Sequence, residues 1–150
     1  MQTTNNIGYL IQHLATSLAR QTDQILLDDV GISFSQFKIL MVLQYNPQLQ
    51  QKQIAERLAQ TQASISRQIR GMEDDGLVKM TANPNNRREH RMTPTDKGIK
   101  KTEQAMQELN SYYQPMLDKL TDNQQQELLN TLSIMHEYAC QSSGWCQVKQ

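Results

Sequence analysis

The sequence predicts a mainly α-helical fold of six helices, with one small β-hairpin between the fourth and the fifth helix. Three observations carry this prediction. Apolar residues recur at helical spacing through most of the 150 residues. Residues that cap or break helices divide this pattern into separate segments. Residues 77–93 lose the helical period, and a turn rich in Asn and Pro splits them into two short runs.

Length and composition indicate a single globular domain spanning residues 1–150. A chain of this length can bury roughly 70% of its unfolded surface. An apolar fraction of 37% with a mean hydropathy of −0.68 excludes general disorder. No apolar run approaches the ~20 residues of a membrane helix, and the N-terminus lacks the basic segment of a secretory signal. We therefore expect a cytoplasmic protein with no membrane partner.

Three helices are predicted before residue 60. The first covers residues 5–28 and ends at the sequence VGIS. Ser33, with Gln36 three residues later, forms a capping-box pattern that opens the second helix, FSQFKILMVLQY. Pro47 ends this helix, because proline disfavours helical geometry in the residue before it. The third helix is the short segment QKQIAERL.

The fourth helix begins at a capping residue, Thr61, and ends before Gly76, which suits a left-handed stop. Ile65, Ile69 and Met72 form the apolar stripe that we expect to be buried. The opposite side carries small and cationic residues: Ala63, Ser66, Arg67 and Arg70. Taken alone, this second face is more typical of an ordinary solvated surface than of a surface that reads DNA.

The hairpin is predicted from residues 77–81 and 88–93, joined by the turn ANPNN. The sequence TPTD then predicts a helix start, with Thr93 as the capping residue, Pro94 in the first helical position and Asp96 in the third. The capping box TDNQ opens the sixth helix. In that helix the residues expected to face inward are Leu128, Leu129, Leu132 and either Met135 or His136.

The first and last helices have more apolar surface than a thin single chain can cover. Helices over residues 5–28 and 94–140 are therefore predicted to pair with those of a second copy. The residues between them, about 33–93, form the lobe that remains.

Charge is unevenly distributed along a chain whose net charge is zero. Residues 1–60 hold four basic and four acidic side chains, and residues 61–101 hold nine and five, a balance of +4. Residues 102–150 hold two and six, a balance of −4. A basic middle region predicts a local anion-binding surface.

Helices three and four are joined so tightly that they must cross steeply, which is the arrangement of a helix-turn-helix. The second helix of that motif, here Thr61–Asp75, enters the major groove of DNA. Small residues let its backbone approach closely. Arg67 can make a two-pronged contact with guanine or contact a phosphate, and Gln62 can read adenine or hold a phosphate.

The hairpin fits the wing of a winged helix. Arg87 and Arg88 lie near its tip, where they can bind phosphates or enter a minor groove, whereas Arg91 suits a role on the strand face. The residues predicted to contact DNA are Gln62, Ala63, Ser64, Ser66, Arg67, Arg70, Arg87 and Arg88.

The segments ISFSQFKIL, IAERLAQTQASISRQIRGMEDDGLV and NPNNRREHRMTPTDKG resemble the multiple-antibiotic-resistance regulator (MarR) family, and the resemblance extends over about residues 5–140. It implies a homodimeric winged-helix repressor that binds a double-stranded, pseudopalindromic DNA operator. It also implies a small-molecule pocket between the dimerisation and DNA-binding lobes. We expect a small aromatic ligand there, whose binding would release the DNA. The residues chosen for that pocket are Tyr9, His13, Arg20 and Phe37.

Two positions depart from the family pattern. The wing usually carries an Asp-x-Arg pair, but Asn86 stands in the acidic position while Arg88 is kept. Ala59 stands where the joint of the helix-turn-helix often has glycine.

The alternative to a regulator is a helical protein–protein adaptor, or a metal or redox sensor that uses a C-terminal cluster of His136, Cys140 and Cys146. The spacing of this cluster is not a usual zinc pattern. The sequence contains no glycine-rich phosphate loop, nucleophile elbow or paired-carboxylate site, so no enzymatic activity and no cofactor are expected.

Overall fold

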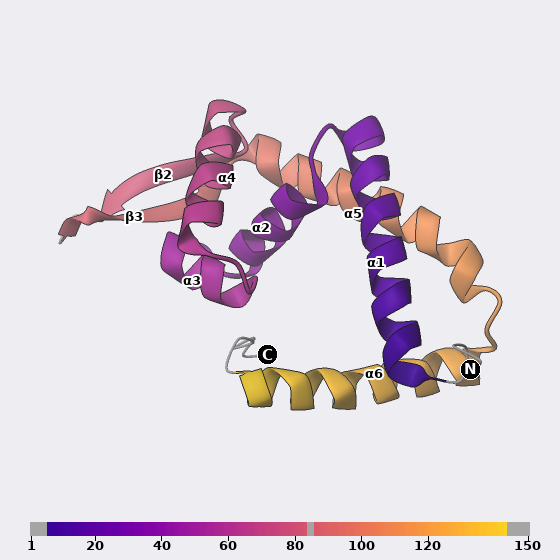
Figure 1. Ribbon diagram of the computed structural model, residues 1–150. Helices are drawn as coiled ribbons and strands as arrows, with labels where there is room; N and C mark the ends of the chain where they lie inside the picture. The colour runs from indigo at the N-terminus through magenta and orange to yellow at the C-terminus, as the bar shows by residue number, and fades with distance from the viewer. Residues whose placement is uncertain (1–5, 84–85, 144–150) are drawn as a thin grey trace.

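The computed structural model describes residues 6–83 and 86–143, and the side chains within residues 6–82 and 90–139. Its elements follow in the order α1 (Ile7–Ile25), η2 (Leu26–Val30), α2 (Phe34–Tyr45), β1 (Leu49–Gln50), α3 (Gln51–Arg57), α4 (Gln62–Asp74), β2 (Val78–Asn83), β3 (Asn86–Pro94), α5 (Asp96–Leu117) and α6 (Asp122–Ser143). The six helices and the hairpin confirm the predicted fold (Figure 1). The π-helical turn η2 and the strand β1 were not predicted.

The start of α2 is fixed both locally and by α1. The Ser33 hydroxyl accepts a hydrogen bond from the Gln36 amide at 3.1 Å, and the Gln36 side chain accepts one from the Ser33 amide at 2.8 Å. The capping box predicted here is therefore confirmed. Asp23 of α1 accepts a further bond from the Phe34 amide at 2.8 Å, which also attaches α1 to the lobe.

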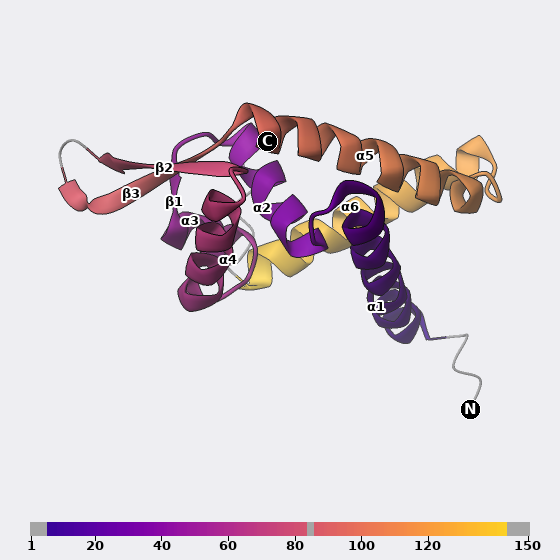
Figure 2. The same cartoon turned by 90° about the horizontal axis from the view of Figure 1, so that it is seen from above.

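The core lies between α2, α3, α4, the sheet and the N-terminal half of α5. Its fully buried side chains are Leu26, Ile32, Ile39, Leu40, Leu43, Ile54, Ile65, Ile69, Met72 and Met92. The view from above places α2 in the middle, with α5 along one side and α3 and α4 at the end that carries the wing (Figure 2). The stripe Ile65, Ile69 and Met72 is buried as predicted.

The three-stranded antiparallel sheet has the order β1-β3-β2. Met92 of β3 pairs with Leu49 on one side and with Met80 on the other, and it is completely buried. This pairing anchors the base of the hairpin to the segment that precedes α3. The two residues of β1 are too few for a recognisable strand pattern, since strand prediction needs about four alternating residues.

The predicted start of α5 was wrong by two residues. Pro94 is the last residue of β3, where it pairs with Val78, and Thr95 rather than Thr93 caps the helix. The Thr95 hydroxyl accepts a hydrogen bond from the Gly98 amide at 3.1 Å. Strand pairing therefore continues through the position at which local capping signals predict a helix.

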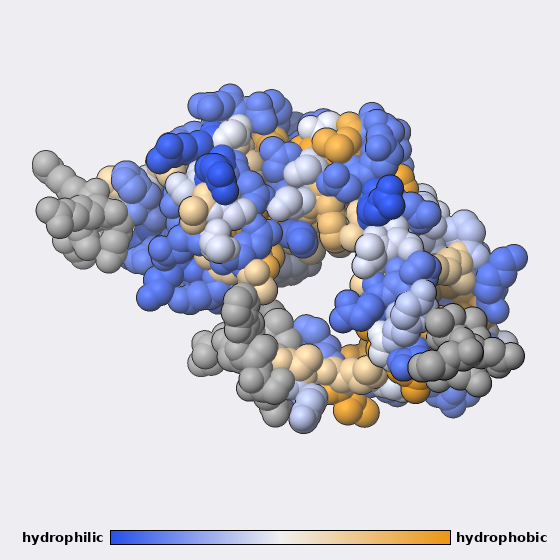
Figure 3. Space-filling view, in the orientation of Figure 1, coloured by the Kyte–Doolittle hydropathy of each residue, from blue (hydrophilic) through white to orange (hydrophobic). Residues whose placement is uncertain are grey.

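The helix α6 runs back beneath the lobe without packing on it (Figure 1), and Figure 3 shows open space between the two. Its capping box is confirmed, because Thr121 and Gln124 bind each other's amides at 2.9 and 3.3 Å. The inward placement of its apolar residues was wrong for a single chain. Leu128, Leu129, Leu132 and Met135 are 43, 60, 45 and 42% exposed, and His136 is exposed too.

No helix in the described part of the chain is both long enough and apolar enough to cross a bilayer.

Candidate nucleic-acid interface

The helix α4 has a defined start and stop. The Thr61 hydroxyl accepts a hydrogen bond from the Ser64 amide at 3.1 Å, as the predicted N-cap should. At the other end Gly76 has a φ of +68°, and the Leu77 amide donates to the Met72 carbonyl at 2.8 Å. This is the left-handed stop that the sequence predicts, in the form of a Schellman motif.

The joint between α3 and α4 has the same geometry at a residue that is not glycine. Ala59 has a φ of +53°, and the Gln60 amide donates to the Ala55 carbonyl at 3.0 Å. A left-handed conformation costs an L-residue roughly 1–2 kcal/mol, so Ala59 is strained. This backbone conformation explains why glycine suits the position.

A network of neutral side chains holds the N-terminal half of α4 against α2. Gln68 donates to Gln60 at 2.8 Å and to the Ser64 hydroxyl at 3.1 Å, and it accepts from the Ser35 hydroxyl at 2.6 Å. Gln60 also donates to Ser35 at 3.4 Å. The network joins the start of α2, the joint and α4, so it fixes the direction in which α4 points.

Sequence reasoning missed this network, although Gln60, Ser64 and Gln68 recur every four residues along one helix face. Ser64 was predicted to contact DNA, and the structure instead gives its half-buried hydroxyl two internal partners. Its contact with DNA stays a prediction.

The remaining predicted residues of α4 point outward. Gln62, Ala63, Arg67 and Arg70 are exposed, and Ser66 is half-buried. In the described part of the chain these five side chains form no hydrogen bond or ion pair. Hydrophilic side chains gather over this part of the lobe in the space-filling view (Figure 3). The outward face of α4 therefore offers two unpaired guanidinium groups beside small side chains.

The wing projects from the lobe beside α4 (Figures 1 and 2). Arg91 donates to the side chain of Gln48 at 3.1 Å, in agreement with the strand-face role predicted for it. Arg87 and Arg88 belong to β3, but their side chains lie outside the described residues, as does the side chain of Asn86. Their contacts with DNA stay predictions.

The predicted ligand residues do not converge on one site. Tyr9 and His13 stack with ring centroids 5.7 Å apart on the exposed surface of α1. Arg20 lies on the same helix, roughly 16 Å beyond Tyr9 at the helical rise per residue. Phe37 is buried and stacks against Phe34, so it belongs to the core. Their role in ligand binding stays a prediction.

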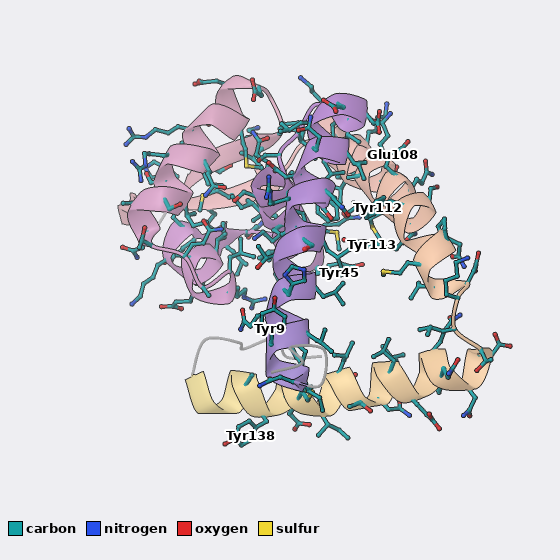
Figure 4. The ribbon with its side chains drawn as sticks, turned by 45° about the vertical axis from the view of Figure 1, so that its right-hand side comes forward. Tyr9, Tyr45, Glu108, Tyr112, Tyr113 and Tyr138 are labelled. Carbon is teal, nitrogen blue, oxygen red and sulfur yellow. The ribbon has the colours of Figure 1, made fainter. Side chains whose placement is uncertain are left out.

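Two tyrosines of α5 connect it to α1 through hydrogen bonds that the sequence did not predict. The Tyr113 hydroxyl lies 2.8 Å from the hydroxyl of Thr22, and the Tyr112 hydroxyl donates to Gln21. Figure 4 shows the two tyrosines together on the side of α5 that faces α1. A concavity of about 380 Å³ lies elsewhere on α5, lined by Lys97, Lys100, Lys101 and Gln104.

For the C-terminal cluster, the Cys140 side chain and Cys146 lie outside the described residues. Within them, no three His, Cys, Asp or Glu side chains are placed to hold a metal ion.

The sequence profile described as MarR family matches residues 30–89, which run from the end of η2 through α4 into the wing. This segment of the chain is similar in sequence to the MarR family. Proteins of the MarR family are DNA-binding transcription regulators and not enzymes. The winged-helix geometry of residues 33–93 is the part of this chain that carries the family pattern.

One curated relative and two solved structures illustrate the similarity. The uncharacterized HTH-type transcriptional regulator YdgJ of Bacillus subtilis (strain 168) is 23% identical over 105 residues, which are 70% of this chain and 64% of YdgJ. The chain thus spans less than two thirds of that relative's length.

The transcriptional repressor CouR, bound to a 23-mer DNA duplex, is 22% identical with a TM-score of 0.79, over 89% of this chain and 94% of CouR. The regulator PcaV from Streptomyces coelicolor, in complex with its natural ligand, is 18% identical with a TM-score of 0.72, over 93% of this chain and 97% of PcaV. At these identities the likeness establishes the fold.

Proposed function

We propose that this chain is a homodimeric repressor of the MarR type that binds a pseudopalindromic operator through α4 and the wing. The observation that carries the proposal is the outward face of α4, where Arg67 and Arg70 have no partner in the described part of the chain. An arginine held on a helix that enters the major groove can bind guanine or a phosphate. CouR, which has a similar fold, was solved with DNA.

Exposed apolar residues on α1, α5 and α6 support the homodimer. Ile7 and Ile134 are each 70% exposed, and the described residues leave the apolar stripe of α6 about half exposed. Several large exposed apolar side chains are typical of an interaction site, and a second copy presents a matching surface. A two-fold dimer implies operator half-sites about one helical turn apart.

Release by a small aromatic ligand is the third part of the proposal. PcaV, a regulator of similar fold, was solved with its natural ligand. A ligand that prefers a spacing of the two α4 helices unsuited to the operator would lower operator affinity by shifting the population of dimers. The stacked pair Tyr9 and His13 is the aromatic surface of α1 best placed to bind such a ligand.

An electrophoretic mobility shift on the promoter of the chain's own gene, repeated at several salt concentrations, tests the DNA-binding part. We expect preference over random DNA, and a salt slope that grows by about 0.9 for each phosphate bound. Binding without preference over random DNA, and insensitive to salt, would contradict the proposal and favour a protein–protein adaptor.

The variant Arg67→Ala separates base reading from phosphate binding. If Arg67 reads a base, its loss weakens operator binding by roughly 5- to 150-fold while random DNA is affected less, since a bidentate base contact discriminates by about 1–3 kcal/mol. Equal weakening of binding to the operator and to random DNA would show that Arg67 contacts the phosphate backbone of the DNA. Lys119→Ala is the matched control, because this exposed lysine lies in the turn after α5 and its loss removes one positive charge outside α4 and the wing.

A further inference from the structure

The C-terminal end of α4 is held by the start of α5. The Thr95 hydroxyl donates to the Gly76 carbonyl, 2.6 Å away, and also lies 3.2 Å from the Leu77 carbonyl oxygen. The Thr95 amide donates to the Leu77 carbonyl at 3.0 Å. The same hydroxyl accepts from the Gly98 amide as the cap of α5. One side chain therefore begins α5 and fastens α4 to it.

Gly98 lets the two segments approach this closely. A Cβ atom at Gly98 would lie 2.1 Å from the Leu77 carbonyl oxygen and 3.1 Å from a methyl group of Leu40. Carbon and oxygen atoms do not approach to 2.1 Å without a bond, so a larger residue would separate α5 from the chain that leaves α4. The atom that a Cβ would meet belongs to the main chain, so it cannot move aside as a flexible side chain could.

Two lysines of α5 complete the joint. Lys97 donates to the Asp75 carbonyl at 2.7 Å, and Lys101 donates to the Val30 carbonyl at the end of η2. Both carbonyls end a helical segment, where the aligned peptide dipoles place partial negative charge. Among the described side chains no carboxylate oxygen lies within ion-pair distance of either ammonium group. The lysines therefore hold helix ends and not acidic side chains.

The helix α4 is thus fixed at two points on different elements. Its N-terminal half is held to α2 by the Gln60, Ser64 and Gln68 network, and its C-terminal end is held to α5 by Thr95. Since α5 continues into the helices proposed to form the dimer, the contact at Thr95 sets how α4 is oriented relative to the dimer axis.

We infer that Thr95 is a positioning residue for operator recognition, which acts by fixing the angle of α4 on α5. This inference rests on the proposed function, because a fixed angle matters only if two α4 helices must match two half-sites. A loosened joint leaves the DNA-binding face intact and removes the preference for one spacing between half-sites.

Three substitutions separate this role from helix capping. Thr95→Ser keeps both the donor to Gly76 and the acceptor for Gly98. Thr95→Asp keeps a good N-cap acceptor but has no proton to donate to Gly76. Thr95→Val keeps the shape and loses both bonds.

The experiment measures binding of each variant to operators whose half-sites are moved apart by one or two base pairs, with random DNA as the reference. We expect Thr95→Asp and Thr95→Val to bind random DNA as the unmodified protein does. Their preference for the native spacing falls roughly three- to tenfold, the equivalent of one hydrogen bond. Thr95→Ser keeps the preference. An unchanged preference in Thr95→Asp overturns the inference.

A thermal melt of the same proteins tests the joint separately from the proposed function. An unmodified protein that prefers no operator over random DNA shows that the proposed function has failed, whereas the melt shows whether the bond from Thr95 to Gly76 stabilises the protein. Thr95→Asp should melt below Thr95→Ser, because the bond to Gly76 is lost while the cap of α5 is kept. Equal melting temperatures for these two variants would show that the bond from residue 95 to the Gly76 carbonyl does not stabilise the protein.

Discussion

The lobe of residues 33–93 and the helix α6 carry the same kind of apolar stripe and differ in what covers it. In α4 the stripe Ile65, Ile69 and Met72 is completely buried by the rest of the lobe. In α6 the stripe that includes Leu129 and Leu132 remains about half exposed. An amphipathic pattern therefore shows that a helix face needs cover, and it does not show whether the cover comes from the same chain.

The largest expected effect contrasts a core residue with its counterpart on α6. Ile69→Ala should lower the free energy of unfolding by about 2–5 kcal/mol, because it leaves a cavity in a closed core. This loss should be the same at any protein concentration. Leu129→Ala should cost stability only at concentrations where a dimer forms, since its cover is proposed to come from a second copy.

Chemical denaturation of both variants at two protein concentrations a hundredfold apart measures this contrast. A loss for Leu129→Ala that does not change with concentration would mean that one chain covers α6 by itself.

The next effect concerns the place where the lobe meets α5. Gly98→Ala should destabilise the protein by about 1–3 kcal/mol or more, because its methyl group would overlap the Leu77 carbonyl oxygen. Gly71→Ala is the matched control, since a Cβ at that position of α4 meets nothing within 4 Å. The control should gain up to about 1 kcal/mol from helix propensity. Thermal unfolding of the two variants should shift in opposite directions, and a shift in the same direction would contradict the close approach.

The two confirmed capping boxes give a smaller contrast. Ser33→Ala should cost about 1 kcal/mol of global stability, because α2 belongs to the cooperative core. Thr121→Ala removes an equivalent cap from α6, and we expect faster amide hydrogen exchange confined to the first turn of that helix. Its free energy of unfolding, measured where the protein is monomeric, should stay within about 0.5 kcal/mol of the unmodified value. A loss of unfolding free energy as large as that of Ser33→Ala would show that α6 unfolds together with the core.

The smallest expected effect is an increase in stability from a substitution within the lobe. Ala59→Gly should stabilise the protein by up to about 1 kcal/mol, because relief of the left-handed strain exceeds the added entropy of an unfolded glycine. Denaturant titration measures this gain. Gln48→Gly, at the other non-glycine residue with positive φ among those described, is a useful comparison, although it also removes the bond from Arg91. A loss on Ala59→Gly would mean that the alanine methyl group makes a contact worth more than the strain.

Local signals in the sequence predicted what depends on neighbouring residues. The capping boxes at Ser33 and Thr121 and the stop at Gly76 need only residues within one turn, and all three are present in the structure. The start of α5 was mispredicted because Pro94 pairs with Val78, sixteen positions earlier in the chain. Local sequence contains no sign of that pairing.

For the candidate interface too, the sequence predicted the local features and not the contacts between distant segments. The outward residues of α4 follow from helical periodicity, and Arg67 and Arg70 are exposed as that periodicity requires. The inward position of Ser64 depends on Ser35, which joins its network from another helix. Such a contact exists only in the folded chain, so the residue type alone could not distinguish a reader of DNA from a member of the scaffold.

The joint between α4 and α5 has a consequence for how this protein can evolve. On the α4 side every group that α5 holds is a main-chain carbonyl, from Asp75, Gly76 and Leu77. Main-chain carbonyls are present whatever side chains the helix carries. The outward residues of α4 can therefore be replaced during divergence toward new operator sequences, while the contacts between α5 and the end of α4 are kept. Thr95, Lys97 and Gly98 have no such freedom, so sequence change should concentrate on one side of this contact.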